Sequence, residues 1–258
     1  MLIDLASNEY DLVRHLFESH KRGRAMIFGW MDLGLGSIKT DSKENPTVAY
    51  FLFTPMSFLA GDASSSGAKD IIRNFPSQTI AIVPDENWNK FVQSEWGEKI
   101  RTQHRTKLSA DSLDIDYLRK IVESLPPVYT LQKIDLDTLN NSAKTYWSAL
   151  QYFFGSFEKF LEDGWGYCIK KGDQTVSVAY TAFPFSDDFE IQVETLDDSK
   201  FRRKGLATIV CAALIEDALL KGITPNWDAA NQPSVHLALK LGYTNPDPYD
   251  VYYWLESP

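Results

Sequence analysis

The short basic segment Phe201–Ala207 (Phe-Arg-Arg-Lys-Gly-Leu-Ala) carries the clearest chemical signal in the chain, between a strand-like and a helix-like stretch. The first amides of a helix have no partners within the helix, and the helix dipole adds partial positive charge there. Gly205 lets backbone N–H groups converge on an oxygen without a side chain in the way. Arg202, Arg203 and Lys204 add formal positive charge. We therefore predict an anion site that suits a pyrophosphate, with a solvated basic turn before an ordinary helix as the alternative.

The elements on either side of this turn must hold it in place. Residues 189–194 alternate strictly, with apolar side chains at the odd positions and polar ones at the even positions, which predicts a strand. Residues 206–220 repeat apolar side chains at three- and four-residue spacing, which predicts an amphipathic helix with one buried face. Lys221-Gly222 would close that helix with a cation in the last turn and a glycine cap.

Two segments together resemble a known family. Arg202–Ala207 resembles the [Gln/Arg]-x-x-Gly-x-[Gly/Ala] signature of the GNAT acyltransferases, in which this turn binds the pyrophosphate of acetyl-CoA. Pro225–Tyr243 is similar to the fifth strand and following helix of that family, with Asn231, a small residue three positions on, and a closing Lys-Leu-Gly-Tyr. The order strand, turn, helix, strand, helix fits as well.

The resemblance narrows to a bacterial two-part GNAT subfamily that includes acetyltransferases of the zwittermicin-resistance type. The segments that carry this closer likeness are Gly164–Cys168, Val193–Thr195, Phe201–Thr208 and Pro225–Val235, with looser support from Asn45-Pro46 and Phe58–Gly61. The resemblance covers nearly the whole chain. It is strong in the C-terminal half and weak in the N-terminal half.

The resemblance implies an α/β (α+β) fold. Residues 131–258 would form the GNAT acetyl-CoA-binding catalytic domain, a central mixed, mostly antiparallel sheet flanked by helices. Residues 1–130 would form a smaller α/β domain on the substrate side. We place the boundary near residues 125–135, because the double proline of Leu125-Pro126-Pro127 stops a helix and suits a linker.

The family's cofactor contacts transfer to this sequence residue by residue. Acetyl-CoA would be the cosubstrate, and no metal is expected. The expected contacts with it are Val193, Thr195, Leu196, Arg202, Arg203, Lys204, Gly205, Leu206, Ala207, Thr208, Asn231 and Ser234. Asn231 could bind the pantetheine arm, cap the following helix, or do both, since its side chain has a donor and an acceptor.

The reaction that the resemblance implies is direct attack of an amine on the thioester, so a base must accept the amine proton. Glu194 is the first candidate for that base and Glu190, on the same strand face, is the second. For both, the alternative is an ordinary polar face of a strand. A backbone N–H within residues 194–196 would donate to the thioester oxygen as it gains charge.

One position departs from the family pattern. Many members have a general-acid tyrosine five residues before the closing aromatic, and here that position is Ala238. Either water protonates the leaving thiolate or another side chain substitutes. The candidates for substitution are His236, Tyr249, Tyr252 and Tyr253.

Composition limits the function classes. The 258 residues include 26 Lys and Arg against 35 Asp and Glu, a net charge of −9, which disfavours nucleic acid as a partner. Cys168 and Cys211 lie among apolar residues and are predicted to be buried thiols. The N-terminus has no signal-peptide pattern and no apolar run approaches the ~20 residues of a membrane span, so we expect a cytoplasmic protein without membrane partners.

Outside the basic turn, the pattern predicts further elements but no internal sequence repeat. Helices are expected over residues 8–22, 68–74, 114–124, 142–154 and 156–163, strands over 48–53, 57–60 and 79–83, and a hairpin over 167–171 and 174–181.

Two functions of different classes follow. The first is an N-acetyltransferase that moves acetyl from acetyl-CoA to a primary amine of a small molecule. The second is a CoA-binding sensor or interaction module that has lost catalysis, which the missing tyrosine at Ala238 motivates. The sequence leaves the acceptor amine and a homodimer open.

Overall fold

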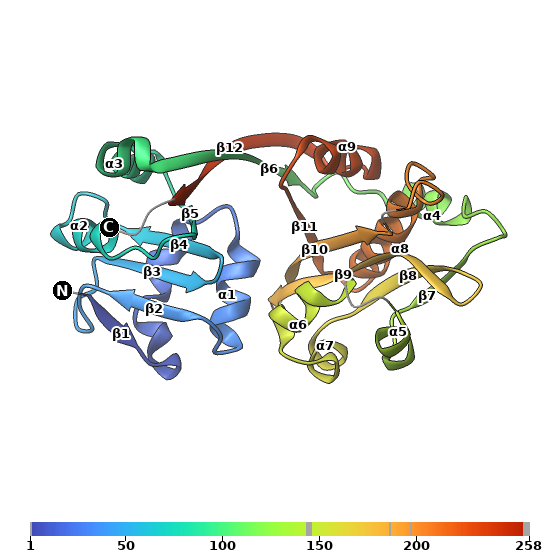
Figure 1. The fold of residues 1–258 in the computed structure, drawn as a ribbon, viewed down its shortest axis with the longest axis horizontal. Helices are drawn as coiled ribbons and strands as arrows, with labels where there is room; N and C mark the ends of the chain where they lie inside the picture. The colour runs from blue at the N-terminus through green and yellow to red at the C-terminus, as the bar shows by residue number, and fades with distance from the viewer. Residues whose placement is uncertain (1, 143–145, 186, 197, 255–258) are drawn as a thin grey trace. The chain divides into compact units, whose positions relative to one another are not determined.

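The computed structural model describes residues 2–142, 146–185, 187–196 and 198–254. The chain forms two compact units: unit 1 is Met1–Thr106 with Pro248–Pro258, and unit 2 is Lys107–Asp247. The chain leaves unit 1 within β6 (Ile100–Ser109) and returns to it within β12 (Thr244–Trp254), as Figure 1 shows. In the described ranges, no helix is long and apolar enough to cross a membrane.

The division therefore falls at Thr106 rather than near residue 130. The double proline Pro126-Pro127 follows α4 (Ile115–Glu123), and α4 belongs to unit 2. Leu118 of α4 is fully buried in the same apolar cluster as the core of unit 2. The prolines thus end a helix without ending a domain.

Unit 1 contains a sheet in the order β1-β2-β3-β4-β5-β12. Its other strands are β1 (Ile3–Leu5), β2 (Ser37–Thr40), β3 (Val48–Phe53), β4 (Met56–Gly61) and β5 (Ile80–Ile82). Its helices are two 3₁₀ helices (Ser7–Leu12 and Arg14–Ser19), α1 (Arg24–Asp32), α2 (Ser66–Arg73), α3 (Glu86–Trp96) and a 3₁₀ turn (Gly97–Lys99). The strands and the short helix predicted in this half are confirmed.

The α-helix predicted over residues 8–22 is wrong. The segment forms the two successive 3₁₀ helices instead. Leu12 is exposed in this segment, whereas Val13 and Phe17 are fully buried. The segment is therefore helical, but it forms two short 3₁₀ helices and no continuous α-helix.

Unit 2 contains a mixed sheet in the order β11-β10-β9-β8-β7, flanked by helices. Its strands are β7 (Thr130–Lys133), β8 (Gly166–Lys171), β9 (Gln174–Phe185), β10 (Asp188–Thr195) and β11 (Thr224–Ala229). Its remaining helices are α5 (Leu136–Asn141), α6 (Ser148–Phe154), α7 (Phe157–Asp163), α8 (Leu206–Leu220) and α9 (Gln232–Leu241). The mixed α/β class, the β8–β9 hairpin and the strand–helix–strand–helix order at the C-terminal end are confirmed. The predicted helix over 142–154 lies partly outside the described residues.

The two units repeat one order of elements. In unit 1, β1 to β4 pair antiparallel in sequence and β5 runs parallel to β4. In unit 2, β7 to β10 pair antiparallel in sequence and β11 runs parallel to β10. Helices follow the first, fourth and fifth strand of each series. The last strand of the second series, β12, pairs with β5 and so completes the sheet of unit 1.

Candidate functional site

The ladder between β10 and β11 opens partway along β10. The parallel pairing runs from Asp188 opposite Thr224 to Glu190 opposite Asn226. β10 continues to Thr195 and stays paired with β9 on its other side. Because a strand edge without a neighbour presents N–H and C=O groups, residues 191–195 offer a template for an extended ligand chain.

The turn between β10 and α8 has a special backbone. Arg203 has a φ of +57° and Gly205 has a φ of +79°, both in the left-handed region. Alternation of left- and right-handed residues turns successive N–H groups toward one point, which makes an anion-binding nest. Phe201 and Leu206 are buried and fix the two ends of the turn to the core. An arginine in this conformation costs about 1 kcal/mol or more, and such strain occurs mostly at functional sites.

The start of α8 differs from most helix starts in this chain. Ser, Asp or Asn side chains accept from the first amides of α2, α3, α4, α5, α7 and α9. α8 instead begins after Gly205, which has no side chain to do so. An added Cβ at Gly205 would meet nothing within 4 Å, so the space in front of these amides is open. The amides are left to an acceptor from outside the helix.

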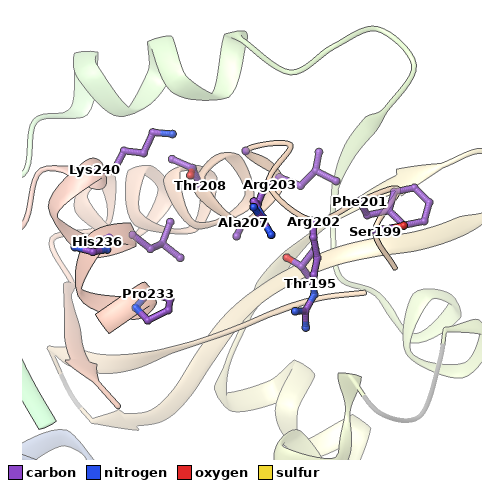
Figure 2. Close-up of a pocket in the computed structure, with 13 residues that line it drawn as sticks. Thr195, Ser199, Phe201, Arg202, Arg203, Ala207, Thr208, Pro233, His236 and Lys240 are labelled. Carbon is purple, nitrogen blue, oxygen red and sulfur yellow. The ribbon is translucent and has the colours of Figure 1, made fainter. Parts of the chain in front are cut away.

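This open space belongs to a pocket of about 1020 Å³. Figure 2 shows that residues of the turn and residues of α9 line it from two sides. Arg202, Arg203 and Lys240 bring positive charge to it. No carboxylate is among the described residues that line it, although the chain as a whole carries a net charge of −9. The pocket therefore suits a polyanion.

Seven of the twelve predicted cofactor residues line this pocket. They are Thr195, Arg202, Arg203, Gly205, Leu206, Ala207 and Thr208. The predicted residues Val193, Leu196, Lys204, Asn231 and Ser234 are not among its lining residues. The pocket adds Ser199, Phe201, Pro233, His236, Leu237 and Lys240. The four residues from α9 are spaced as one helix face, a signal that could have identified them from the sequence.

Asn231 and Ser234 have defined partners at the start of α9. The Asn231 side-chain oxygen accepts from the Ser234 amide at 3.0 Å, so Asn231 caps the helix. The Ser234 hydroxyl accepts from the indole N–H of buried Trp227 at 3.1 Å. The capping part of the Asn231 prediction is confirmed, and its amide N–H groups remain as donors for a ligand.

The two candidate bases have different environments. Glu190 is 5% exposed, and the Lys107 ammonium donates to its carboxylate at 2.8 Å. Burial raises the pKa of Glu190, with nearby Asp228 and Asp188 adding to the rise and Lys107 opposing it. This carboxylate is held in an interior ion pair, so a solvent-accessible amine would not meet it. Glu190 fits a structural role better than that of a base.

Glu194 is half-buried rather than enclosed. Burial raises the pKa of Glu194 above its ordinary value, and a hydrogen bond from Gln192 opposes the rise. Its charge acts on two aromatic hydroxyls: burial, with Glu194 adding, raises the pKa of Tyr146 to about 12 and that of Tyr180 further. A partly accessible carboxylate with a raised pKa is the better candidate for a general base.

Ala238 stands where many family members have a tyrosine as general acid, and its side chain cannot donate a proton. Ala238 is fully buried in the core of unit 2. Of the four candidate substitutes, His236 lines the pocket of unit 2. Tyr249, Tyr252 and Tyr253 belong to unit 1, where the Tyr252 hydroxyl donates to Asn89 at 3.0 Å.

Neither cysteine is placed for nucleophilic chemistry. Cys168 and Cys211 are free and fully buried, as the sequence predicted. Burial raises the pKa of the Cys168 thiol to about 11 and that of Cys211 further. A reactive cysteine needs a stabilised thiolate, and these environments oppose it. Within the described ranges, no group of three or more His, Cys, Asp or Glu side chains could hold a metal ion.

The interior ion pair predicts a large effect on stability. Replacing Lys107 by methionine leaves the Glu190 carboxylate buried without its cation, with Asp188 and Asp228 nearby. We expect a loss of about 3–5 kcal/mol in the free energy of unfolding, measured by urea denaturation. The double replacement Lys107→Met with Glu190→Leu removes both charges and should recover at least half of that loss. A single variant as stable as the wild type would contradict the ion-pair assignment.

Comparison with known proteins identifies the family of the chain. The family model described as GNAT acetyltransferase matches residues 14–252. An uncharacterized N-acetyltransferase of Bacillus subtilis (strain 168), YdfB, is 23% identical over 98% of this chain and 98% of its own length.

Solved structures resemble the whole chain as well. A GCN5-related N-acetyltransferase-like protein from Streptococcus suis 89/1591 has a TM-score of 0.78 and 26% identity, over 97% of this chain and all of the other. A tandem GNAT protein from the clavulanic acid biosynthesis pathway has a TM-score of 0.62 and 13% identity over 98% of this chain and 96% of its own, a likeness of fold alone. With its family model spanning nearly all of its length, the chain belongs to the GNAT family and is an acetyltransferase.

Proposed function

We propose that this acetyltransferase moves an acetyl group from acetyl-CoA to a primary amine of a small molecule, by direct attack in a ternary complex. The observation that carries the proposal is the start of α8, where a glycine takes the place of a capping side chain and the turn bears two arginines. The lining of the adjoining pocket supports it, since no carboxylate is among the described residues there.

Acetyl-CoA fits the residues present and would supply the thioester. Arg202, Arg203 and the first amides of α8 would bind the pyrophosphate. The strand edge of residues 191–195 would pair with the amides of the pantetheine arm, with Asn231 as a further donor. A backbone N–H within residues 194–196 would donate to the thioester oxygen as it gains charge.

Proton transfer would involve one side chain of this chain. Glu194 would accept the proton of the attacking amine, directly or through a water molecule. The leaving thiolate would take its proton from water, because the position of the family's tyrosine is Ala238. The buried, raised-pKa cysteines support direct transfer over an acyl-enzyme route.

Unit 1 repeats the order of elements of unit 2 but lacks a corresponding anion site, which supports a single acetyl-CoA per chain. In unit 1 the turn that corresponds to the basic turn is the segment before α2. There the Ser65 hydroxyl accepts from the Ala68 amide at 3.3 Å, and Asp62 adds negative charge. Residues 62–65 contain no lysine or arginine. That turn is closed by its own side chains and suits no polyanion.

The acceptor is proposed from charge and resemblance. A chain with a net charge of −9 attracts cationic amines over long range. The likeness to the zwittermicin-resistance subfamily also favours a small amine. Acceptor recognition by the N-terminal half and a cytoplasmic location stay predictions.

Release of CoA thiol from acetyl-CoA across a panel of small primary amines tests the function. We expect release that depends on an amine, and calorimetry should give one CoA bound per chain. Binding of CoA without turnover on any amine would favour the sensor or interaction module. Absence of CoA binding would overturn the cosubstrate assignment itself.

A further inference from the structure

One face of α9 forms the wall of the pocket opposite the basic turn. Pro233, His236, Leu237 and Lys240 line the pocket, at spacings of three, one and three residues. Side chains at such spacings point to the same side of a helix. Figure 2 shows His236 and Lys240 on α9 and Arg202 and Arg203 on the turn before α8, and all four residues line the pocket.

The positive charge of the pocket exceeds what one pyrophosphate explains. The turn already supplies Arg202, Arg203 and the unfilled amides of α8 for two phosphoryl groups. Lys240 lies on another element, with His236 one helical turn before it. An anionic ligand in this pocket would therefore meet cationic side chains from both the turn and α9. A second anionic group of the ligand would meet Lys240.

The pocket is also larger than a pyrophosphate needs. Its volume is about 1020 Å³, at the upper end of the roughly 300–1,000 Å³ of small-molecule sites. The ordinary role of a lysine in the last turn of a helix is to satisfy the last carbonyl groups. Here the Tyr117 hydroxyl already donates to the Lys240 carbonyl at 3.0 Å. The ammonium group of Lys240 is thus not needed for that carbonyl.

We infer that Lys240, assisted by His236, binds the 3′-phosphate on the ribose of CoA and makes the protein prefer CoA to 3′-dephospho-CoA. This rests on the proposed function, because the pyrophosphate in the turn places the nucleotide end of the ligand in this pocket. The 3′-phosphate is the anionic group that CoA has beyond its pyrophosphate. Lys240 is therefore a specificity residue for the donor and takes no part in the chemical step.

Calorimetric titration of CoA and of 3′-dephospho-CoA tests this inference. We expect the wild type to bind CoA at least about tenfold more tightly, as one charge-assisted contact provides. In Lys240→Gln that preference should fall to about twofold or less, through weaker CoA binding with the affinity for 3′-dephospho-CoA unchanged. His236→Gln should reduce the preference by a smaller factor.

Lys120→Gln is the matched control. Lys120 is an exposed lysine in the last turn of α4. It is not among the lining residues of the pocket. Lys120→Gln should keep the full preference for CoA. Both Lys120→Gln and Lys240→Gln should keep the melting temperature of the wild type.

The outcomes separate the two proposals. Equal binding of both ligands by the wild type would overturn the 3′-phosphate subsite and leave the proposed function standing. Weaker binding of both ligands in Lys240→Gln would also overturn it, because Lys240 would then act on the shared part of the ligand. Binding of neither ligand would overturn the proposed function and this inference with it.

Discussion

Replacing Gly205 by valine is expected to lower the affinity for CoA by at least about 100-fold while the chain still folds. The added side chain would project into the open space in front of the first amides of α8, where the pyrophosphate would lie. Loss of several charge-assisted hydrogen bonds to backbone donors corresponds to roughly 3 kcal/mol or more. The left-handed backbone at Gly205 adds a cost in stability of about 1–2 kcal/mol for any L side chain.

Gly222 provides the control for that backbone cost. It has a φ of +72°, and a Cβ there would also meet nothing within 4 Å. It follows the other end of α8 and is not among the lining residues of the pocket. Gly222→Val and Gly205→Val should therefore lower the melting temperature by similar amounts, while calorimetry should find weaker CoA binding only in Gly205→Val. Unchanged binding in a folded Gly205→Val would show that the pyrophosphate lies elsewhere.

The basic turn could be predicted from the sequence because its signals are local. The alternating residues 189–194, the glycine at 205 and the apolar spacing of residues 206–220 are each contained within one element or its boundary. The structure forms β10, the turn and α8 there, although α8 is buried on most of its surface and not on one face alone. A helix start depends on the few residues that surround it, so neighbouring positions are enough to predict it.

The unit boundary and the repeat depend on contacts that are distant in sequence. β12 pairs with β5 although more than half of the chain separates them. Nothing local in Thr244–Trp254 indicates that partner. The repeat is one of element order and strand direction, and two unrelated sequences can satisfy the same patterns of burial. A turn with Asp62 and a turn with Arg202 therefore occupy corresponding places without sequence likeness.

The choice between the two glutamates was likewise beyond the sequence. Alternation places Glu190 and Glu194 on the same face of β10. What separates them is Lys107, which lies 83 positions before Glu190 and neutralises it in the interior. At Glu194 no such cation contributes to the pKa, and burial is the main cause of its rise. The structure thus leaves Glu194 as the better candidate for the base and shows Glu190 as an ion-paired residue.

Replacing Glu194 by glutamine is expected to lower kcat by about 10²–10⁴-fold with a smaller change in KM, the usual effect of losing a general base. The pH dependence provides a sharper test. With Glu194 as the proposed base, two groups must be deprotonated for reaction, the amine of the substrate and Glu194. Below the pKa of the amine, log kcat/KM should rise with pH with a slope of one. Below the pKa of Glu194 the slope should be two, because both groups then lose protons together.

The sign of the pKa shift sets where the steeper limb begins. Burial raises the pKa of Glu194. As the pH falls, Glu194 is therefore protonated at a higher pH than an ordinary glutamate. In the wild type, the part of the pH profile with a slope of two should therefore begin at a pH above the ordinary glutamate pKa of 4.5. In Glu194→Gln the slope should stay at one. The control is Lys107→Met with Glu190→Leu, which removes the other candidate together with its cation. That variant should be less stable yet keep the limb of slope two, whereas a wild-type profile in Glu194→Gln would remove Glu194 as the base.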